Sequence, residues 1–245
     1  MKHSLKIEKN IFQVKFKPDL SFYDRLFKNE KLFGSFPHWQ TDRLKISLRD
    51  FDKKHSLTIK HDSITYESDN YNKKNSDEII NSIHDNISNI TCNDHINRLG
   101  QRFLCLIPVS LNFDELVKIL NLKILNKDYI IVLDDVPKDS SITITSNNNG
   151  IDYRLQIGPM RNTEIPNYIN FNIENHIDVN SEKKYHELSK LVENYPKTSL
   201  YIDLDFSVQS IDSRSTIVDF NNTSKQLFNE ITKNLVEYIF EEKLK

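Results

Sequence analysis

Asp203 and Asp205 are the two residues of this sequence whose type and spacing best suit metal-dependent chemistry. They alternate with Ile202, Leu204 and Phe206, and alternate side chains of a strand lie on one face. The two carboxylates would then sit about 7 Å apart. Such oxygens suit Mg²⁺ or Mn²⁺, and a metal-dependent hydrolase or nuclease would use them if further carboxylates converged there. The alternative interpretation is the solvated outer face of an antiparallel strand.

A second acidic pair, Asp134 and Asp135, follows the apolar stretch 130–133. Acidic residues at strand ends occur in metal-dependent enzymes, so either aspartate could supply the extra carboxylate that the hydrolase hypothesis needs. The segment 137–140, which comes directly afterwards, has the composition of a turn. The turn is therefore the competing interpretation of this pair.

Arg98, Gly100 and Arg102 form the candidate ligand-binding motif of the chain. Two guanidinium groups can hold a carboxylate or a phosphate through paired hydrogen bonds. A glycine between them allows a bulge or a close approach of the backbone. The motif predicts an anion or nucleic-acid sensor, and the alternative interpretation is a pair of structural salt bridges to nearby acids.

Signatures of cofactor chemistry are missing from the sequence. With four glycines, the chain has no glycine-rich phosphate loop and no Gly-x-Ser-x-Gly nucleophile motif. The histidines are scattered without metal-ligand spacing, and Cys105 lies in the apolar run 103–107, where we expect a buried free thiol. We therefore expect no cofactor.

Composition and charge narrow the class of protein. The chain has 245 residues, a formal net charge of −2 and a pI of about 6.5, so it lacks the overall basic character of nucleic-acid-binding domains. Residues 1–6 lack the apolar core of a signal peptide, and no apolar stretch is long enough to span a bilayer. We expect a cytoplasmic protein without a membrane partner.

The first part of the chain predicts a strand, a helix, a set of strands and a second helix. Phe12, Val14 and Phe16 alternate with polar residues, which indicates a half-buried strand. Further short strands are expected at 44–48, 57–59 and 64–66, and helices after Pro18 and after Asn75.

The second part repeats this outline. The run 102–109 predicts a buried strand, and Asn112 with Glu115 has the spacing of a capping box. Asn149-Gly150 between two alternating segments predicts a hairpin. Other expected elements are strands at 129–133 and 201–208, a helix that Ser181 caps and Pro196 ends, and a long helix that begins at Asn222 or Thr223.

The element order predicts an α+β fold with two packed lobes of antiparallel sheet, helices on one face and a long C-terminal helix. The expected lobes are residues 1–95 and 96–245, and their similar outlines suggest that they are structurally related. No flexible linker separates them in the sequence, so we expect the lobes to pack against each other.

Three motifs in order resemble a sporadically distributed family of uncharacterised prokaryotic proteins of about this length. These are Arg98-Leu99-Gly100-Gln101-Arg102-Phe103, the hairpin 141–157, and Leu200-Tyr201-Ile202-Asp203-Leu204-Asp205 followed by a terminal helix. The family usually continues the first motif with a polar and a basic residue, where this chain has Leu104-Cys105-Leu106. The resemblance implies a soluble α+β protein of open activity, with the scattered occurrence of toxin–antitoxin and phage-defence modules.

Two aromatic residues are candidate partner-binding positions: Trp39, after Pro37-His38, and Phe240, which lies off the apolar stripe of the last helix. The alternative interpretation of Trp39, and the commoner use of a tryptophan, is packing in the core. Together with the lack of catalytic motifs, they favour a non-catalytic protein-binding module. It would be an accessory or antitoxin-like component of a mobile-element or antiviral defence system, with a partner encoded nearby. The alternatives are the hydrolase that uses Asp203 and Asp205 and the sensor that uses Arg98 and Arg102.

Overall fold

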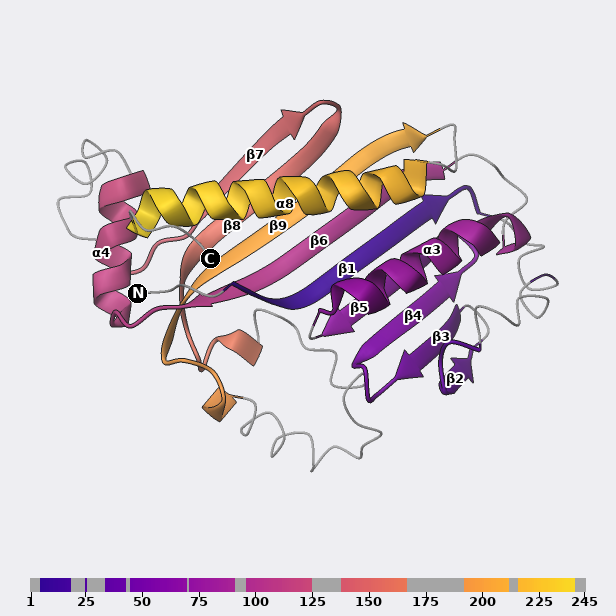
Figure 1. The fold of residues 1–245 in the computed structure, drawn as a ribbon, viewed down its shortest axis with the longest axis horizontal. Helices are drawn as coiled ribbons and strands as arrows, with labels where there is room; N and C mark the ends of the chain where they lie inside the picture. The colour runs from indigo at the N-terminus through magenta and orange to yellow at the C-terminus, as the bar shows by residue number, and fades with distance from the viewer. Residues whose placement is uncertain are drawn as a thin grey trace.

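The computed structural model of the protein describes residues 5–18, 25, 34–42, 45–69, 71–90, 96–124, 138–166, 192–211 and 216–240. In these residues the chain forms one antiparallel sheet of nine strands, covered by helices on one face (Figure 1). The elements in chain order are β1 (Lys6–Phe16), β2 (His38–Thr41), β3 (Lys45–Asp50), β4 (His55–Lys60), β5 (Ser63–Asp69), α3 (Lys73–Ile90), β6 (Ile96–Pro108), α4 (Phe113–Ile124), β7 (Ile142–Asn148), β8 (Ile151–Arg161), β9 (Thr198–Ile211) and α8 (Thr216–Phe240). The expected α+β class, with a long C-terminal helix, is confirmed.

The strand order is β2-β3-β4-β5-β1-β6-β9-β8-β7. The first strand of each half, β1 or β6, lies in the middle of the sheet, and the last strand of each half, β5 or β9, lies beside it. The remaining strands follow outwards in reverse chain order, so the second half repeats the arrangement of the first. Because β1 and β6 pair directly, the two halves share one sheet. The division into lobes at residue 95 stays a prediction.

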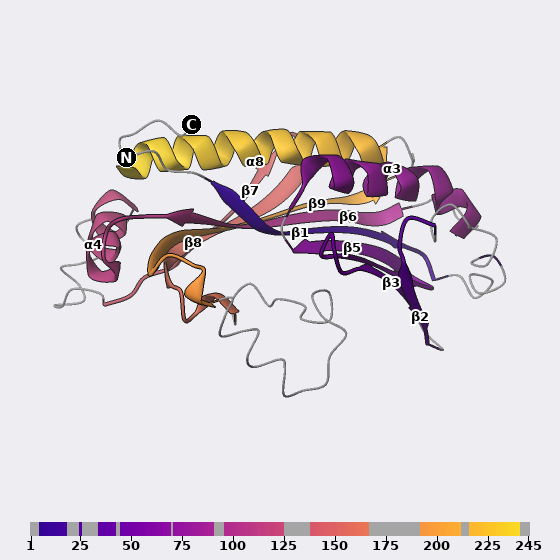
Figure 2. The same ribbon diagram turned by 60° about the horizontal axis from the view of Figure 1, so that its bottom comes forward.

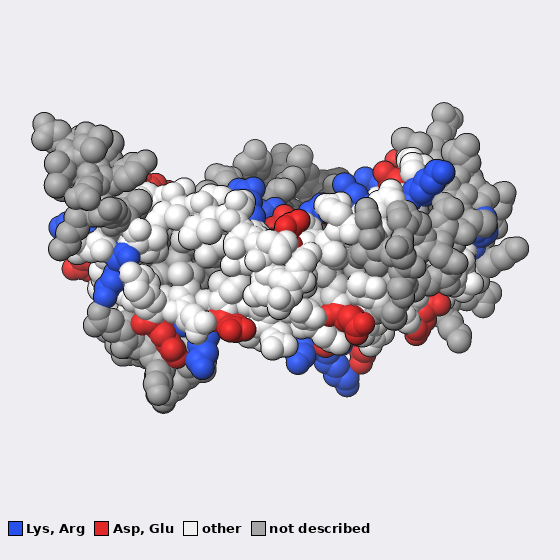
Figure 3. Space-filling model, turned by 90° about the horizontal axis from the view of Figure 1, so that it is seen from above, with Lys and Arg blue, Asp and Glu red and all other residues white. Residues whose placement is uncertain are grey.

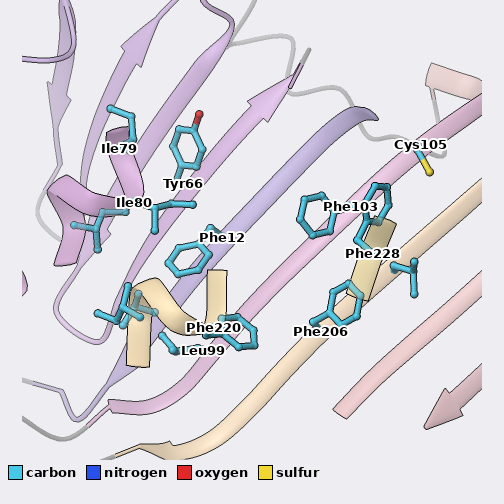
Figure 4. Packing of buried hydrophobic residues seen from close by; sticks show 14 of the residues in the cluster. Phe12, Tyr66, Ile79, Ile80, Leu99, Phe103, Cys105, Phe206, Phe220 and Phe228 are labelled. Atoms are coloured by element: carbon cyan, nitrogen blue, oxygen red, sulfur yellow. The ribbon is translucent and has the colours of Figure 1, made fainter. Parts of the chain in front are cut away.

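The helices α3 and α8 lie on the same side of the sheet, as the edge-on view shows (Figure 2). The apolar core fills the space between these helices and the sheet. Phe103 of β6 stacks on Phe228 of α8 with ring centroids 4.5 Å apart, and Phe12 of β1 lies 6.3 Å from Phe220 (Figure 4). The expected burial of Cys105 is confirmed. We call the opposite side of the sheet the far face.

Local sequence signals explain several element boundaries. Asn149 and Gly150 both have positive φ, 50° and 84°, which is what a two-residue hairpin turn requires. Asn112 and Glu115 exchange two hydrogen bonds of 2.9 Å, so the predicted capping box at the start of α4 is confirmed.

Two predicted helix starts are wrong. The backbone N–H of Asn75 donates to Oδ1 of Asn72 at 3.2 Å, so Asn72 rather than Asn75 caps α3. Helix α8 begins at Thr216 rather than at Asn222 or Thr223, because Ile217 and Phe220 extend its buried face by further turns.

Several expected elements cannot be compared with the structure. The strand at 129–133 with Asp134 and Asp135, and the helix expected between Ser181 and Pro196 as far as residue 191, lie outside the described residues. The helix expected after Pro18 does so almost entirely.

A buried polar seam fixes the two long helices on the sheet. Gln101 of β6 donates to Asn221 of α8 at 3.1 Å, and Asn221 donates to Asp77 of α3 at the same distance. The ammonium of Lys225 also donates to Asp77, and Ser224 donates to Gln101. Burial lowers the pKa of Lys225, while its contact with Asp77 opposes this shift. The seam therefore fixes the N-terminal parts of α3 and α8 relative to each other and to β6.

Replacing Asp77 by alanine should destabilise the fold by about 2 kcal/mol, because it leaves a largely buried ammonium without its carboxylate. Urea unfolding measures the change. Lys225→Met in the Asp77→Ala background should recover most of the loss, since the unpaired charge is then gone. If the double variant is no more stable than Asp77→Ala alone, the ion pair is not what holds the helices there.

A second buried polar group joins β3, β4, β5 and α3. His55 lies 3.7 Å from a carboxylate oxygen of Asp50, its Nδ1 lies 3.5 Å from the hydroxyl of Tyr66, and that hydroxyl lies 3.2 Å from Ser76. The ring of Phe36 packs on His55 at 5.0 Å. Burial lowers the pKa of His55 to about 4, Asp50 opposes this shift and Lys53 adds to it. His55 is therefore neutral in the folded protein at neutral pH.

The free energy of unfolding should fall as pH drops from about 6.5 to about 4, because the unfolded chain then binds a proton that folded His55 does not. The full effect of this one group is about 3 kcal/mol. Urea unfolding across this pH range measures it. His55→Gln should flatten this part of the profile, whereas His61→Gln, a change in the turn between β4 and β5, should leave it intact. An unchanged profile in His55→Gln would contradict the assignment.

Candidate functional site: arginines and aspartates on the far face

The pairing of β6, β9 and β8 gathers charged side chains on the far face. Arg102 of β6 lies opposite Asp205 of β9, and Asp205 lies opposite Arg154 of β8. Asp203 and Gln156 form the next pair along on the same face. Strand alternation places Asp203 and Asp205 on one face, as the sequence predicts. The neighbouring strands bring basic residues, Arg102 and Arg154, to the same face.

Arg102 and Asp203 form a two-pronged ion pair. The guanidinium Nε and Nη2 of Arg102 donate to the two carboxylate oxygens of Asp203 at 2.9 and 2.6 Å. The side chain of Asp203 is only 6% exposed, and that of Arg102 is 42% exposed. The hydrogen bond to Asp203 raises the pKa of Arg102. Asp203 is thus not part of a solvated outer face, and the carboxylate that Arg102 holds belongs to the protein.

Arg98 lies over Gly100 on the same strand. A Cβ atom at Gly100 would sit 3.6 Å from Nη2 and 3.7 Å from Cζ of Arg98, so the guanidinium rests directly above the glycine. Because Gly100 has no side chain, the guanidinium of Arg98 can occupy the space above it. The predicted clamp of Arg98 and Arg102 around one external anion is not what the geometry shows, because Arg102 is occupied by Asp203.

Asp205 lies among three guanidinium groups without an ion pair to any of them in the described part of the chain. Burial raises its pKa, Asp203 adds to this shift, and Arg98, Arg102 and Arg154 oppose it. Asp205 and Arg154 line a hollow of about 340 Å³, together with Asp152, Ser207 and residues of β7. Figure 3, in which the helices lie below, shows acidic and basic side chains adjoining in the upper middle of the view.

A larger hollow of about 480 Å³ lies further along β8 and β9, over Met160 and Tyr201. Its acidic residues are Asp139 and Glu164, and Glu164 already accepts a hydrogen bond from the side chain of Arg161 at 3.2 Å. Among the described residues that line the larger hollow, no basic side chain accompanies these acids.

The described residues contain no group of three or more histidine, cysteine, aspartate or glutamate side chains that could hold a metal ion. Asp203 is committed to Arg102, and Asp205 faces arginines instead of further carboxylates. The structure therefore gives the hydrolase hypothesis no support within these residues.

The first half of the sheet carries a comparable ion group on β1 and β5. The ammonium of Lys9 lies 3.7 Å from Asp69 and 3.8 Å from Glu67, and both Lys9 and Asp69 are buried. In each half, a basic residue of the central strand thus meets acids of its neighbour on the far face. In the first half Lys9 lies beside both acids, whereas in the second half Asp205 and Arg154 face a hollow.

The two aromatic partner-binding candidates differ in exposure. Trp39 is 62% exposed on β2, the strand at one edge of the sheet. Phe240 is half-buried and packs against the core, while Tyr238 beside it is 57% exposed. Trp39 is therefore the better placed of the two.

Arg154 is the site residue that our sequence reasoning missed. A signal was present, because Asp152, Arg154 and Gln156 alternate with Tyr153, Leu155 and Ile157. This alternation predicts that Arg154 lies on the polar face of its strand, but it does not predict that β9 is the neighbouring strand.

No protein-family model and no curated protein matches the chain. The resemblance to a sporadic prokaryotic family therefore stays a prediction. Among the described helices, none combines the length and apolar character needed to cross a membrane.

Replacing Arg102 by alanine should destabilise the protein by about 2 kcal/mol, because Asp203 loses its partner while buried. Solvent around the half-exposed guanidinium keeps the loss below the 3–5 kcal/mol typical of fully buried pairs. Urea unfolding measures the change. Arg154→Ala, an exposed arginine of the same cross-strand row, should cost less than about 0.5 kcal/mol. Equal losses in the two variants would contradict a special role of the Arg102–Asp203 pair.

Proposed function

We propose that the protein is a non-catalytic binding module that takes up an extended, acidic segment of a partner protein at the β2 edge of its sheet. The observation that carries this proposal is Trp39, a large apolar side chain that is 62% exposed on an edge strand. Tryptophan is enriched among the residues that dominate interface energies. An edge strand also offers a row of backbone groups with which a partner strand can pair.

The two faces beside this edge differ in character. Trp39 lies opposite Leu48 and therefore on the helix side of the sheet. On the far face the described residues of β2, β3 and β4 carry no acidic side chain, and the charged ones there are Lys45, Arg49 and Lys60. Lys45 and Lys60 face each other across β3 and β4, and both are exposed. This charge distribution favours a partner segment whose far-face side chains are acidic.

The proposal places the module among accessory or antitoxin-like components of mobile-element or phage-defence systems, with a partner encoded nearby. Support for this part comes from the family resemblance alone. The binding surface itself is argued from Trp39 and the basic side chains, so it stands independently of that biological setting.

Tagged protein purified from its native host should carry a partner that depends on Trp39 and on the basic side chains. Trp39→Ala should weaken binding of that partner about 30-fold, as expected for a central aromatic residue. Lys45→Glu/Lys60→Glu should weaken it further and remove its salt dependence. Mass spectrometry identifies the partner, and fluorescence anisotropy with its acidic segment measures the affinity.

Leu122→Ala is the matched control, because Leu122 is also 62% exposed but lies on α4, at the end of the molecule remote from β2 (Figure 1). Binding should be unchanged in this variant. If Leu122→Ala abolishes binding while Trp39→Ala does not, the interface lies at the α4 end and the proposal is wrong. A clean protein without any partner would also count against it.

A further inference from the structure

The hollow over β7, β8 and β9 presents an acid and a base that no ion pair joins among the described residues. Arg154 and Asp205 are direct neighbours across β8 and β9, and both line the hollow. Arg154 donates to Gln156 at 3.3 Å, and no ion pair joins Arg154 to Asp205 among the described residues. Adjacent opposite charges of this kind can each bind the opposite charge of one ligand.

The other polar groups that line the hollow add hydrogen-bond acceptors beside Asp205. Asp152 accepts a hydrogen bond of 2.7 Å from Asn147 at one of its carboxylate oxygens. Ser207 lies opposite Asp152, so its hydroxyl is on the same face. An ammonium group has three N–H donors, and Asp205, Asp152 and Ser207 offer three acceptors from two adjacent strands. A simple anion could bind Arg154 but would leave the carboxylates of Asp205 and Asp152 in the same hollow without a partner from the ligand.

We propose that this hollow binds a free amino acid, with its ammonium group at Asp205 and Asp152 and its carboxylate at Arg154. A zwitterion carries no net charge, so it suits a hollow lined by both signs. The size of about 340 Å³ lies at the lower end of the range for small-molecule sites. Burial raises the pKa of Asp205, Arg98 and Arg102 oppose this shift from the β6 side, and an arriving ammonium group should lower the pKa further.

This proposal is independent of protein binding at β2. The hollow lies over the strands at one edge of the sheet, whereas β2 is the strand at the other edge. A variant that removes one activity should therefore leave the other unchanged.

Isothermal titration calorimetry with each standard L-amino acid tests the proposal on the whole chain. At least one should bind saturably below about 10 mM. Its N-acetyl and its amide derivatives, which lack the ammonium or the carboxylate, should each bind at least tenfold more weakly. The derivatives also represent the two ends of a peptide, so they separate a free amino acid from a peptide terminus.

The site variants should give a matching result. Arg154→Ala and Asp205→Asn should each weaken binding by about tenfold to a hundredfold, which is the worth of one charge-assisted hydrogen bond. Lys74→Ala, which removes an exposed charge on α3, on the helix side of the sheet, should bind as the wild type does. Circular dichroism checks that all variants fold.

Three outcomes would overturn the proposal. One is the absence of binding by any amino acid up to about 10 mM. Another is equal binding of the amide derivative, which would show that only the ammonium is recognised. The third is binding that survives both Arg154→Ala and Asp205→Asn, which would place the ligand elsewhere.

Discussion

The pairing of β1 with β6 is the interaction on which the rest of the molecule depends. It joins the two halves into one sheet, along almost the whole length of both strands. Strand β6 contacts three neighbouring elements: it pairs with β1 and β9, and its Gln101 and Phe103 contact α8. Its opposite face carries Arg98, Gly100 and Arg102. A shift of one residue in this register would exchange the core face with the charged face.

The two faces of the sheet carry different kinds of side chain and make different contributions to the protein. On the helix side, aromatic and aliphatic side chains exclude water and supply most of the stability. On the far face, charged side chains of neighbouring strands form partly buried ion groups. Lys9 lies beside Asp69 and Glu67 on β1 and β5, and Arg102 pairs with Asp203 on β6 and β9, where the neighbouring Asp205 faces a hollow. The net charge of −2 for the whole chain does not reveal these ion groups, because it adds acids and bases without regard to where they lie.

Much of the local structure could be predicted from the sequence. The Asn149-Gly150 turn and the Asn112–Glu115 cap follow from rules that involve only near neighbours, and alternation assigned Asp203 and Asp205 to one face. The strand order could not be predicted, because it is set by pairings between segments far apart in the chain. The partner of Asp203 illustrates the limit: Arg102 is 101 residues away, and no local pattern connects the two. Alternation states which side chains share a face, but not which strand lies beside them.

The central place of β1 also affects how the protein is made. A ribosome releases β1 to β5 before β6, so until β6 has emerged the nascent chain can hold β1 with one edge paired to β5 and the other edge unpaired. An unpaired edge beside an apolar face readily accepts another strand. Two nascent chains on one messenger can therefore supply β6 to each other's β1. Such an exchange would give a swapped dimer held by the same contacts as the monomer, at a small cost in free energy.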